Sequence, residues 1–190
     1  MKKPLCFVDV ETTGLNSAIH EIIEISIIKV CPQKGMTIYT TKIQPENIQH
    51  ASPKALEING YNHRDWERAP AAESVVFYIS ELLSGSILVG HNVRFDEEFI
   101  SELLHLYGSK QRYSRRMIDT ITLAHEHLPR LHSLSMDSIR GYFFWDKSNA
   151  HTAYVDAMDC MRLYYKLLRA NAFNRTYWRM RNRVLSLFRR

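Results

Sequence analysis

Residues 7–15 read Phe7-Val8-Asp9-Val10-Glu11-Thr12-Thr13-Gly14-Leu15, and this segment predicts both a buried strand and a chemical site at its end. The apolar run that begins at Leu5 is typical of a strand covered on both faces. Asp9 and Glu11 are two residues apart, so they point to the same face of that strand. Carboxylates this close repel each other and are costly to desolvate, and a hard cation such as Mg²⁺ or Mn²⁺ would offset both costs. The alternative is a strand end with two solvated acids.

Length and composition indicate one ordinary globular domain. The chain has 190 residues, of which 45% are hydrophobic and 24% charged. Cys6, Cys31 and Cys160 are widely spaced and form neither a disulfide framework nor a zinc motif, so we expect a reducing compartment, the cytoplasm. The apolar run after Lys3 is too short for a signal peptide, and no stretch is long enough to insert stably into a membrane.

The net charge of +5 is unevenly distributed along the chain. Residues 160–190 contain nine Lys or Arg and no Asp or Glu, which leaves sixteen basic and twenty acidic residues, a net charge of −4, in residues 1–159. We therefore expect a mildly acidic domain over residues 1–169 and a basic, amphipathic extension over residues 170–190. Such an extension could bind nucleic acid, a protein partner or an anionic surface, or pack on its own domain.

The hydrophobic pattern predicts five strands. The second covers residues 21–30, with Glu24, Ser26 and Lys29 on a partly exposed side. A turn over residues 31–35 leads to a weakly alternating edge strand over residues 36–43. These strands and the first form an antiparallel meander, while a short apolar strand over residues 87–90 is expected to be parallel to the first. A fifth strand ends at Asp119.

Helices are expected between and after these strands. The ranges are residues 52–57 with Ser52 as N-cap, 71–84, 94–107 with Phe95, Phe99, Leu103 and Leu106 inward, 120–127, a segment capped by Ser133, and 151 to about 170.

Two later segments carry further acidic residues. Asp96 falls in the first turn of a predicted helix, near the end of the preceding strand. His151 lies at the start of the last helix, and Asp156 lies about one and a half turns inside it. We therefore expect a histidine that can swing in a loop beside a rigidly held carboxylate. His125, His127 and His132 are expected to be surface residues, because no pattern of carboxylates accompanies them.

The ordered set Asp9, Glu11, Asp96, His151 and Asp156 resembles the DEDDh branch of the DnaQ-like 3′–5′ exonucleases. The matching segments are residues 7–15, 88–99 and 151–157, supported by residues 52–60 and 118–124. The sister branch has a tyrosine four residues before the last aspartate, where this chain has Thr152. Asp159 does not fit as the last aspartate, because the residue four positions before it is Val155. The resemblance covers roughly residues 4–168.

The resemblance implies an RNase H-like α/β fold, with a five-stranded mixed sheet (antiparallel meander plus parallel strands) flanked by helices. It also implies two divalent ions, Mg²⁺ or Mn²⁺, about 4 Å apart on the scissile phosphate. Asp9 would bridge both ions, Glu11 and Asp156 would bind the ion that holds the attacking water, and Asp96 would serve the second ion. His151 would be the general base, since an imidazole with an ordinary pKa of about 6.5 suits that role.

The same resemblance implies a pocket for the terminal nucleotide. The residues expected there are Thr12, Thr13, Gly14, Leu15, Asn92, Phe95 and Ile58, although turn or core roles remain alternatives for several of them. The product would be a nucleoside 5′-monophosphate released from a nucleic-acid 3′ end.

Three functions are compatible with these residues. The first is hydrolysis of DNA 3′ ends, single-stranded or frayed, in proofreading or repair, with a polymerase or other protein partner reached through residues 170–190. The second is a 3′–5′ exoribonuclease, because the sugar is read by the shape of the pocket. The third is a nucleic-acid-binding or polymerase-associated module that does not cleave.

Overall fold

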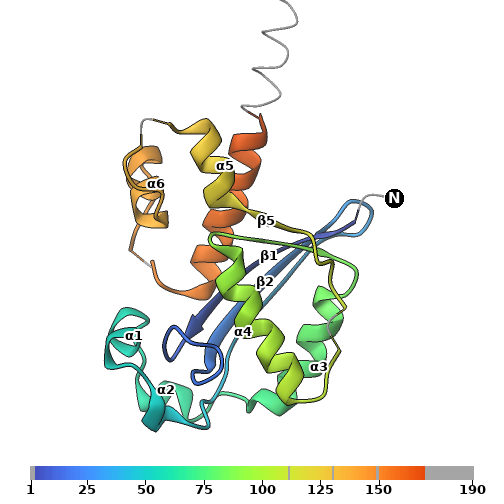
Figure 1. Cartoon of the computed structure of the whole chain (residues 1–190), viewed down its shortest axis with the longest axis vertical. Helices are drawn as coiled ribbons and strands as arrows, with labels where there is room; N and C mark the ends of the chain where they lie inside the picture. Colours follow the sequence, from blue (N-terminus) through green and yellow to red (C-terminus); the bar gives the residue numbers. More distant parts are fainter. Residues whose placement is uncertain (1–2, 111, 130, 149, 170–190) are drawn as a thin grey trace, which may run out of the picture.

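The computed structural model describes residues 3–110, 112–129, 131–148 and 150–169, so the predicted extension over residues 170–190 lies outside the described residues. One five-stranded sheet, in the order β3-β2-β1-β4-β5, forms the centre of the fold (Figure 1). The strands are β1 (Leu5–Thr12), β2 (Ile22–Cys31), β3 (Gly35–Lys42), β4 (Ile87–Gly90) and β5 (Met117–Asp119).

The sheet is mixed, as predicted. β1 pairs with β2 and β2 with β3 in antiparallel register, which forms the expected meander, and β3 lies at the edge. β4 is parallel to β1, and β5 is parallel to β4. β1 therefore has an antiparallel neighbour on one side and a parallel neighbour on the other.

Helices cover both faces of the sheet (Figure 1). α3 (Ala72–Leu83) and α4 (Val93–Leu106) lie on one face, and α5 (Thr120–His127) and helix 153–169 lie on the other. α6 (Met136–Phe143) packs outside α5 and helix 153–169. The remaining short elements are η1 (Ile48–His50), α1 (Pro53–Ile58) and α2 (His63–Trp66).

The alternation of side chains along β1 directs the acidic residues to one face. Cys6, Val8 and Val10 belong to the core cluster that includes α3 and α4. Phe7 belongs to the opposite cluster, with Ala157 and Cys160 of helix 153–169. Because successive strand residues alternate between faces, the side chains two and four positions after Phe7 also face helix 153–169. Those residues are Asp9 and Glu11.

β4 ends early, and its end creates the space for the site. β1 pairs with β4 only over Leu5, Cys6 and Phe7. Beyond that point the backbone N–H of Val10 donates to Asp96 Oδ1 at 3.1 Å, so a side chain of α4 replaces the missing strand partner. Asn92 adopts a left-handed conformation (φ 76°) that turns the chain from β4 into α4.

Several predictions about individual residues are wrong. Glu24 and Ser26 are buried, because β2 lies inside the sheet, with β1 on one edge and β3 on the other. Leu106 is 68% exposed, since α4 turns its last residues to solvent. The cap of α6 is Ser135, which accepts from the N–H of Ser138, and Ser133 lies two residues before it. The last helix begins at residue 153 instead of 151.

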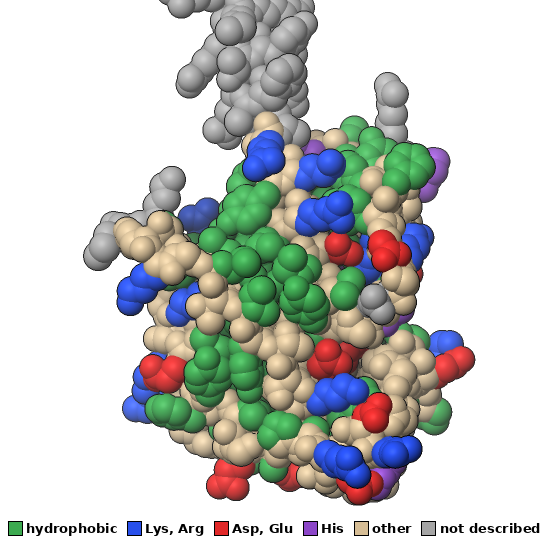
Figure 2. Space-filling model, turned by 180° about the vertical axis from the view of Figure 1, so that it is seen from behind, with side chains coloured by type: hydrophobic (Ala, Val, Ile, Leu, Met, Phe, Trp, Pro, Cys, Tyr) green, Lys and Arg blue, Asp and Glu red, His purple; other side chains and the backbone are tan. Residues whose placement is uncertain are grey.

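Hydrophobic side chains also reach the surface of the rear face, where they form a group among charged residues (Figure 2). The structure nevertheless contains, among its described residues, no helix that is both long enough and apolar enough to cross a membrane.

Gly90 at the end of β4 has no room for a side chain. A Cβ there would lie 2.9 Å from Val93 Cα and 3.1 Å from Asp96 Oδ2. We expect Gly90→Ala to push the start of α4 away from β1 and to lower the midpoint of thermal unfolding by about 4–8 °C. The control is Gly141→Ala in α6, whose Cβ would meet only Lys147 Nζ at 3.7 Å. An equally large loss in both variants would contradict the steric argument.

Candidate active site

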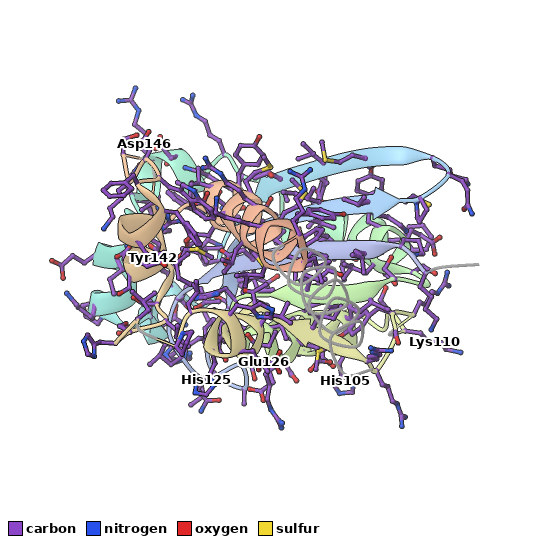
Figure 3. The ribbon with its side chains drawn as sticks, turned by 90° about the horizontal axis from the view of Figure 1, so that it is seen from above. His105, Lys110, His125, Glu126, Tyr142 and Asp146 are labelled. Carbon is purple, nitrogen blue, oxygen red and sulfur yellow. The ribbon has the colours of Figure 1, made fainter. Side chains whose placement is uncertain are left out.

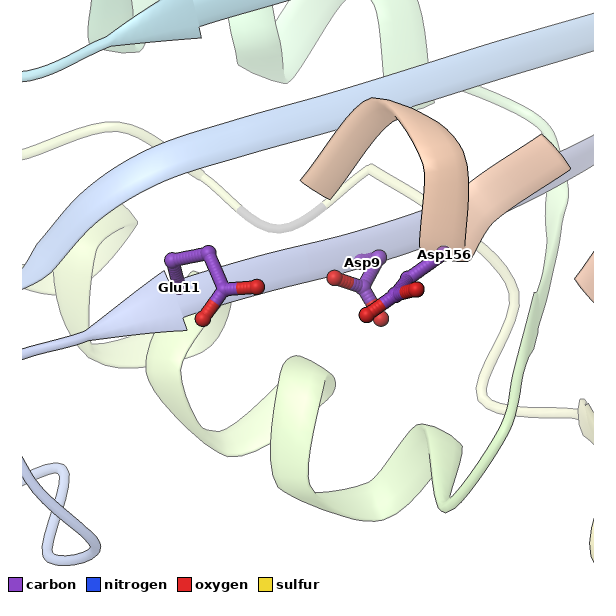
Figure 4. Close-up of side chains that lie close together, drawn as sticks. All are labelled: Asp9, Glu11 and Asp156. Atoms are coloured by element: carbon purple, nitrogen blue, oxygen red, sulfur yellow. The ribbon is translucent and has the colours of Figure 1, made fainter. Parts of the chain in front are cut away.

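Three carboxylates converge beside the end of β1 (Figure 4). Asp9 and Glu11 extend from β1 toward helix 153–169, and Asp156 extends from the first turns of that helix toward them. One oxygen from each residue lies within 4.8 Å of the others. The structure thus brings together residues that are 147 positions apart in the sequence.

Asp96 approaches the same place from α4. Its side chain is buried, and its Oδ1 accepts the N–H of Val10, the residue between Asp9 and Glu11. It lies outside the group of three ligand oxygens, but its charge raises the pKa of both Asp9 and Glu11. Asp96 therefore belongs to the same cluster of carboxylates, with one oxygen already used by the backbone.

Burial is the main cause that raises the pKa of each carboxyl of the cluster, and neighbouring carboxylates add to it. For Asp9 the main cause is burial, followed by the charges of Asp96 and Asp156. Burial also raises the pKa of Glu11 to about 8 and that of Asp96 to about 8. Without a nearby cation, these groups are costly to keep ionised.

A divalent cation fits this arrangement. Mg²⁺ and Mn²⁺ prefer carboxylate oxygens, and the spacing of the three oxygens allows one ion to contact all of them. Such an ion would lower the pKa of its ligands and remove the repulsion that the fold imposes. The residues at the end of β1 therefore fit a metal site.

Arg140 of α6 lies behind Asp156 and was not identified from the sequence. The guanidinium is buried, and its Nη2 donates to Asp156 Oδ1. Its Nε donates to Asp159 Oδ2 at 2.8 Å, and its Nη1 donates to Asp137 Oδ1 at 3.1 Å. Burial disfavours its charge, but the bonds to Asp159 and Asp156 outweigh that effect and raise the pKa of Arg140.

His151 lies just before helix 153–169, near enough to Asp156 for its charge to act on the pKa of that carboxyl. It adopts a left-handed conformation (φ 64°), and its side chain is 47% exposed. Its Nε2 lies 3.8 Å from Asp137 Oδ2. Asp137 thus lies between the imidazole and Arg140, and the role of His151 as a general base stays a prediction.

The predicted nucleotide-binding residues divide into two groups. Thr12, the last residue of β1, and Thr13 and Gly14, in the turn after it, are all buried. The Thr12 hydroxyl donates to Gly14 O at 2.6 Å, and the Thr13 hydroxyl accepts from Glu21 N at 2.9 Å. These hydroxyls shape the turn, and the backbone of Thr13 is also bonded, since its N–H donates to Glu21 O at 2.9 Å and its carbonyl accepts from Ser52 N at 2.7 Å.

The second group is more exposed. Leu15 is 85% exposed and Ile58 is 48% exposed, so both side chains are available to a ligand. Asn92 is exposed at the start of α4, and its N–H donates to Asp119 Oδ1 at 3.2 Å. Phe95 is half-buried against Phe99, with ring centroids 4.9 Å apart. Asn59, next to Ile58, donates to Thr12 O at 3.0 Å and ties α1 to the end of β1.

Glu24 is a further acidic residue near the site. It lies opposite Glu11 in the register of β1 and β2, so the two side chains share one face. Its carboxylate is bonded to the backbone of Ala153, the first residue of helix 153–169. An antiparallel pairing of the two strands, worked out residue by residue, would have revealed it.

His91, His125 and His127 do not belong to this group of carboxylate ligands. Figure 3 shows His125 and Glu126 of α5 pointing outward from the fold. His127 bonds to the Leu123 carbonyl at 2.7 Å. His91 has a structural position, with Nδ1 2.9 Å from Thr120 Oγ1 and Nε2 2.7 Å from Leu134 O. Among the described residues, the carboxylate group is the one with the geometry of a metal site.

Comparison with known proteins identifies relatives of this chain. A family model described as "Exonuclease" matches residues 6–164. The DNA polymerase III subunit epsilon of Treponema pallidum (strain Nichols) is 30% identical over 166 residues, which cover 86% of this chain and 76% of that protein. A PolC-type DNA polymerase III of Caldanaerobacter subterraneus subsp. tengcongensis is 28% identical over 160 residues, which cover 84% of this chain but 11% of that protein.

A solved structure shows the same fold. The zinc-bound form of E. coli ExoI in a complex with single-stranded DNA has a TM-score of 0.76 to this chain at 16% sequence identity. The match covers 90% of this chain and 41% of the ExoI chain. This likeness confirms the predicted RNase H-like fold.

The raised carboxyl pKa values predict how the metal-free protein responds to pH. Between the ordinary value of 4.5 and the folded pKa of about 8, Glu11 keeps a proton in the folded protein that the unfolded chain has lost. The free energy of unfolding therefore falls as pH rises through this window, and Asp96 acts in the same direction. In chelator, we expect an unfolding midpoint several degrees lower at about pH 8 than at about pH 5.5.

Two controls test this origin of the pH dependence. Glu11→Gln removes one of the titrating groups and should flatten the curve. Added Mn²⁺ should stabilise the protein most at high pH, because it binds ionised carboxylates. A midpoint that rises with pH in chelator would contradict the assignment.

Proposed function

The chain belongs to this exonuclease family, and from that membership we propose that it is a two-metal-ion 3′–5′ exonuclease of the DEDDh type. It would hydrolyse phosphodiester bonds at DNA 3′ ends and release nucleoside 5′-monophosphates. The observation that carries the proposal is the convergence of half-buried Asp9, Glu11 and Asp156 on one point, with Asp96 beside them.

The carboxylates would hold the ions. Asp9 would contact both, Glu11 and Asp156 would hold the ion on the side of the attacking water, and Asp96 would serve the other. Mg²⁺ or Mn²⁺ supplies charge stabilisation for the attacking and leaving oxygens of an in-line displacement. The zinc-bound form of the ExoI complex supports a divalent ion in a relative, while the choice of Mg²⁺ or Mn²⁺ follows from the all-oxygen ligand set.

His151 would act as the general base for the attacking water. Its imidazole is partly exposed and lies near Asp156, so it would take the proton of the attacking water from the solvent side. The proton of that water would pass to a ring nitrogen of His151. Asp137, 3.8 Å away, would favour the imidazolium that forms.

We expect His151→Ala to lower kcat by about 10²–10⁴-fold, because a general base typically contributes that much. The variant should keep its affinity for Mn²⁺, since His151 lies outside the carboxylate group, and this affinity can be measured by calorimetric titration. Unchanged turnover at neutral pH would rule out the general-base role.

The matched control is Asp9→Ala, which removes the central ligand and should abolish both Mn²⁺ binding and turnover. A nucleic-acid-binding module that does not cleave would bind DNA equally well with or without Asp9. This control therefore separates the enzyme from the binding module.

DNA is the substrate that the relatives favour. Two of them are DNA polymerase III proteins, and the ExoI structure contains single-stranded DNA. We infer a proofreading or repair role in the cytoplasm, with a polymerase as protein partner. The matched residues make up 11% of the PolC-type protein and 76% of the epsilon subunit. The proposal therefore concerns the exonuclease alone.

A time course on labelled oligonucleotides tests polarity and sugar preference. With Mg²⁺ or Mn²⁺, we expect a 3′ label on single-stranded DNA to appear as mononucleotide and a 5′ label to give a ladder. Chelator should stop both reactions. Faster degradation of RNA than of the matched DNA would replace the proposal with an exoribonuclease, and cleavage that frees the 5′ nucleotide first would refute the polarity.

A further inference from the structure

Arg140 is a buried cation in contact with a candidate metal ligand. It is 1% exposed, and its Nη2 donates to Asp156 Oδ1. Asp156 also offers a carboxylate oxygen to the group of candidate metal ligands that it forms with Asp9 and Glu11. The same carboxylate thus serves both the metal site and the guanidinium.

Arg140 is fixed in place from the opposite side. Asp159 lies one helical turn after Asp156 and is 7% exposed, and its Oδ2 accepts from Arg140 Nε at 2.8 Å. Asp159 lies outside the group of ligand oxygens. Asp137, on the same helix as Arg140, accepts from Nη1 at 3.1 Å. The guanidinium therefore has two anchors that are not candidate metal ligands.

The cluster has an excess of negative charge that Arg140 partly compensates. Four carboxylates meet at the end of β1, namely Asp9, Glu11, Asp96 and Asp156. Removal of the Arg140 guanidinium would leave their negative charge uncompensated. A positive charge next to Asp156 also repels any cation bound by that carboxylate. The guanidinium and a metal ion therefore compete for the same negative charge.

We propose that Arg140 is the built-in counter-ion of the metal site, a positioning residue that holds Asp156 in place without metal and thereby lowers the affinity of the site for a divalent ion. This inference rests on the proposed metal-dependent function. Because coupling between two bound charges is reciprocal, what Arg140 adds to the stability of the empty site it removes from metal binding.

The first test is Arg140→Gln. In chelator, we expect its unfolding midpoint to fall by about 6–15 °C, because one partner of a buried ion pair has been removed. Its dissociation constant for Mn²⁺, measured by calorimetry, should tighten by roughly tenfold, the effect of removing a unit charge about 5 Å from a divalent ion even with strong screening. A purely structural arginine would lower stability and leave Mn²⁺ binding equal or weaker, and that result would overturn the inference.

Asp159→Asn is the matched variant, with the opposite expected sign. An asparagine oxygen can still accept from Arg140 Nε, but the charge that offsets the guanidinium is gone. We expect Mn²⁺ to bind about threefold more weakly, since the full positive charge now acts on Asp156. Arg140→Lys keeps the positive charge but lacks the forked N–H donors of the guanidinium. This variant should keep the Mn²⁺ affinity within about twofold of the native value.

These variants keep the inference testable if Arg140→Gln does not fold. Folding of that variant only when Mn²⁺ is added would support the counter-ion role. If it is unfolded in both conditions, Asp159→Asn decides, because equal or tighter binding of Mn²⁺ would overturn the inference. Thermal unfolding and Mn²⁺ titration of these variants do not require a nucleic-acid substrate. A native protein that binds Mn²⁺ but leaves DNA 3′ ends intact would refute the proposed activity alone, whereas one that does not bind Mn²⁺ would refute both proposals.

Discussion

Four carboxylates meet where β1 leaves its parallel neighbour, and burial makes their ionised forms costly. The surrounding structure can be understood as the means of tolerating this charge. The N–H of Val10 donates to Asp96, Arg140 donates to Asp156, and Glu24 is bonded to the start of helix 153–169. Each of these contacts gives one acid a donor, and the end of β1 remains as the place for a metal ion.

The sheet topology explains why the charges meet there. β1 has a long antiparallel partner in β2, but β4 accompanies it for three residues and then turns into α4. On the side of β4, the last residues of β1 therefore have no strand partner, and side chains from two different helices can approach them. α4 brings Asp96 to one edge, while helix 153–169 brings Asp156 over the face that Asp9 and Glu11 share.

Sequence reasoning predicted the sheet correctly, because the sheet follows from local patterns, while the roles of the site residues stay predictions. Apolar runs define the strands, and the spacing of Asp9 and Glu11 fixes their common face. Arg140 and Glu24 were missed since their roles depend on contacts with residues far along the chain, namely Asp156 and Ala153. Burial of a charged residue in a helix or strand carries no local signal when its partner is distant. The same limit applied to Leu106, whose exposure depends on where α4 ends relative to the sheet.

The carboxylates that form the site come from opposite ends of the domain, with Asp9 in the first strand and Asp156 in the last described helix. A ribosome makes these residues at very different times, and the first-made pair has no partner until residue 156 has emerged and the final helix has docked. A nascent or prematurely terminated chain therefore lacks one of the three grouped carboxylates, and on the proposed mechanism it has no complete place to hold a metal ion.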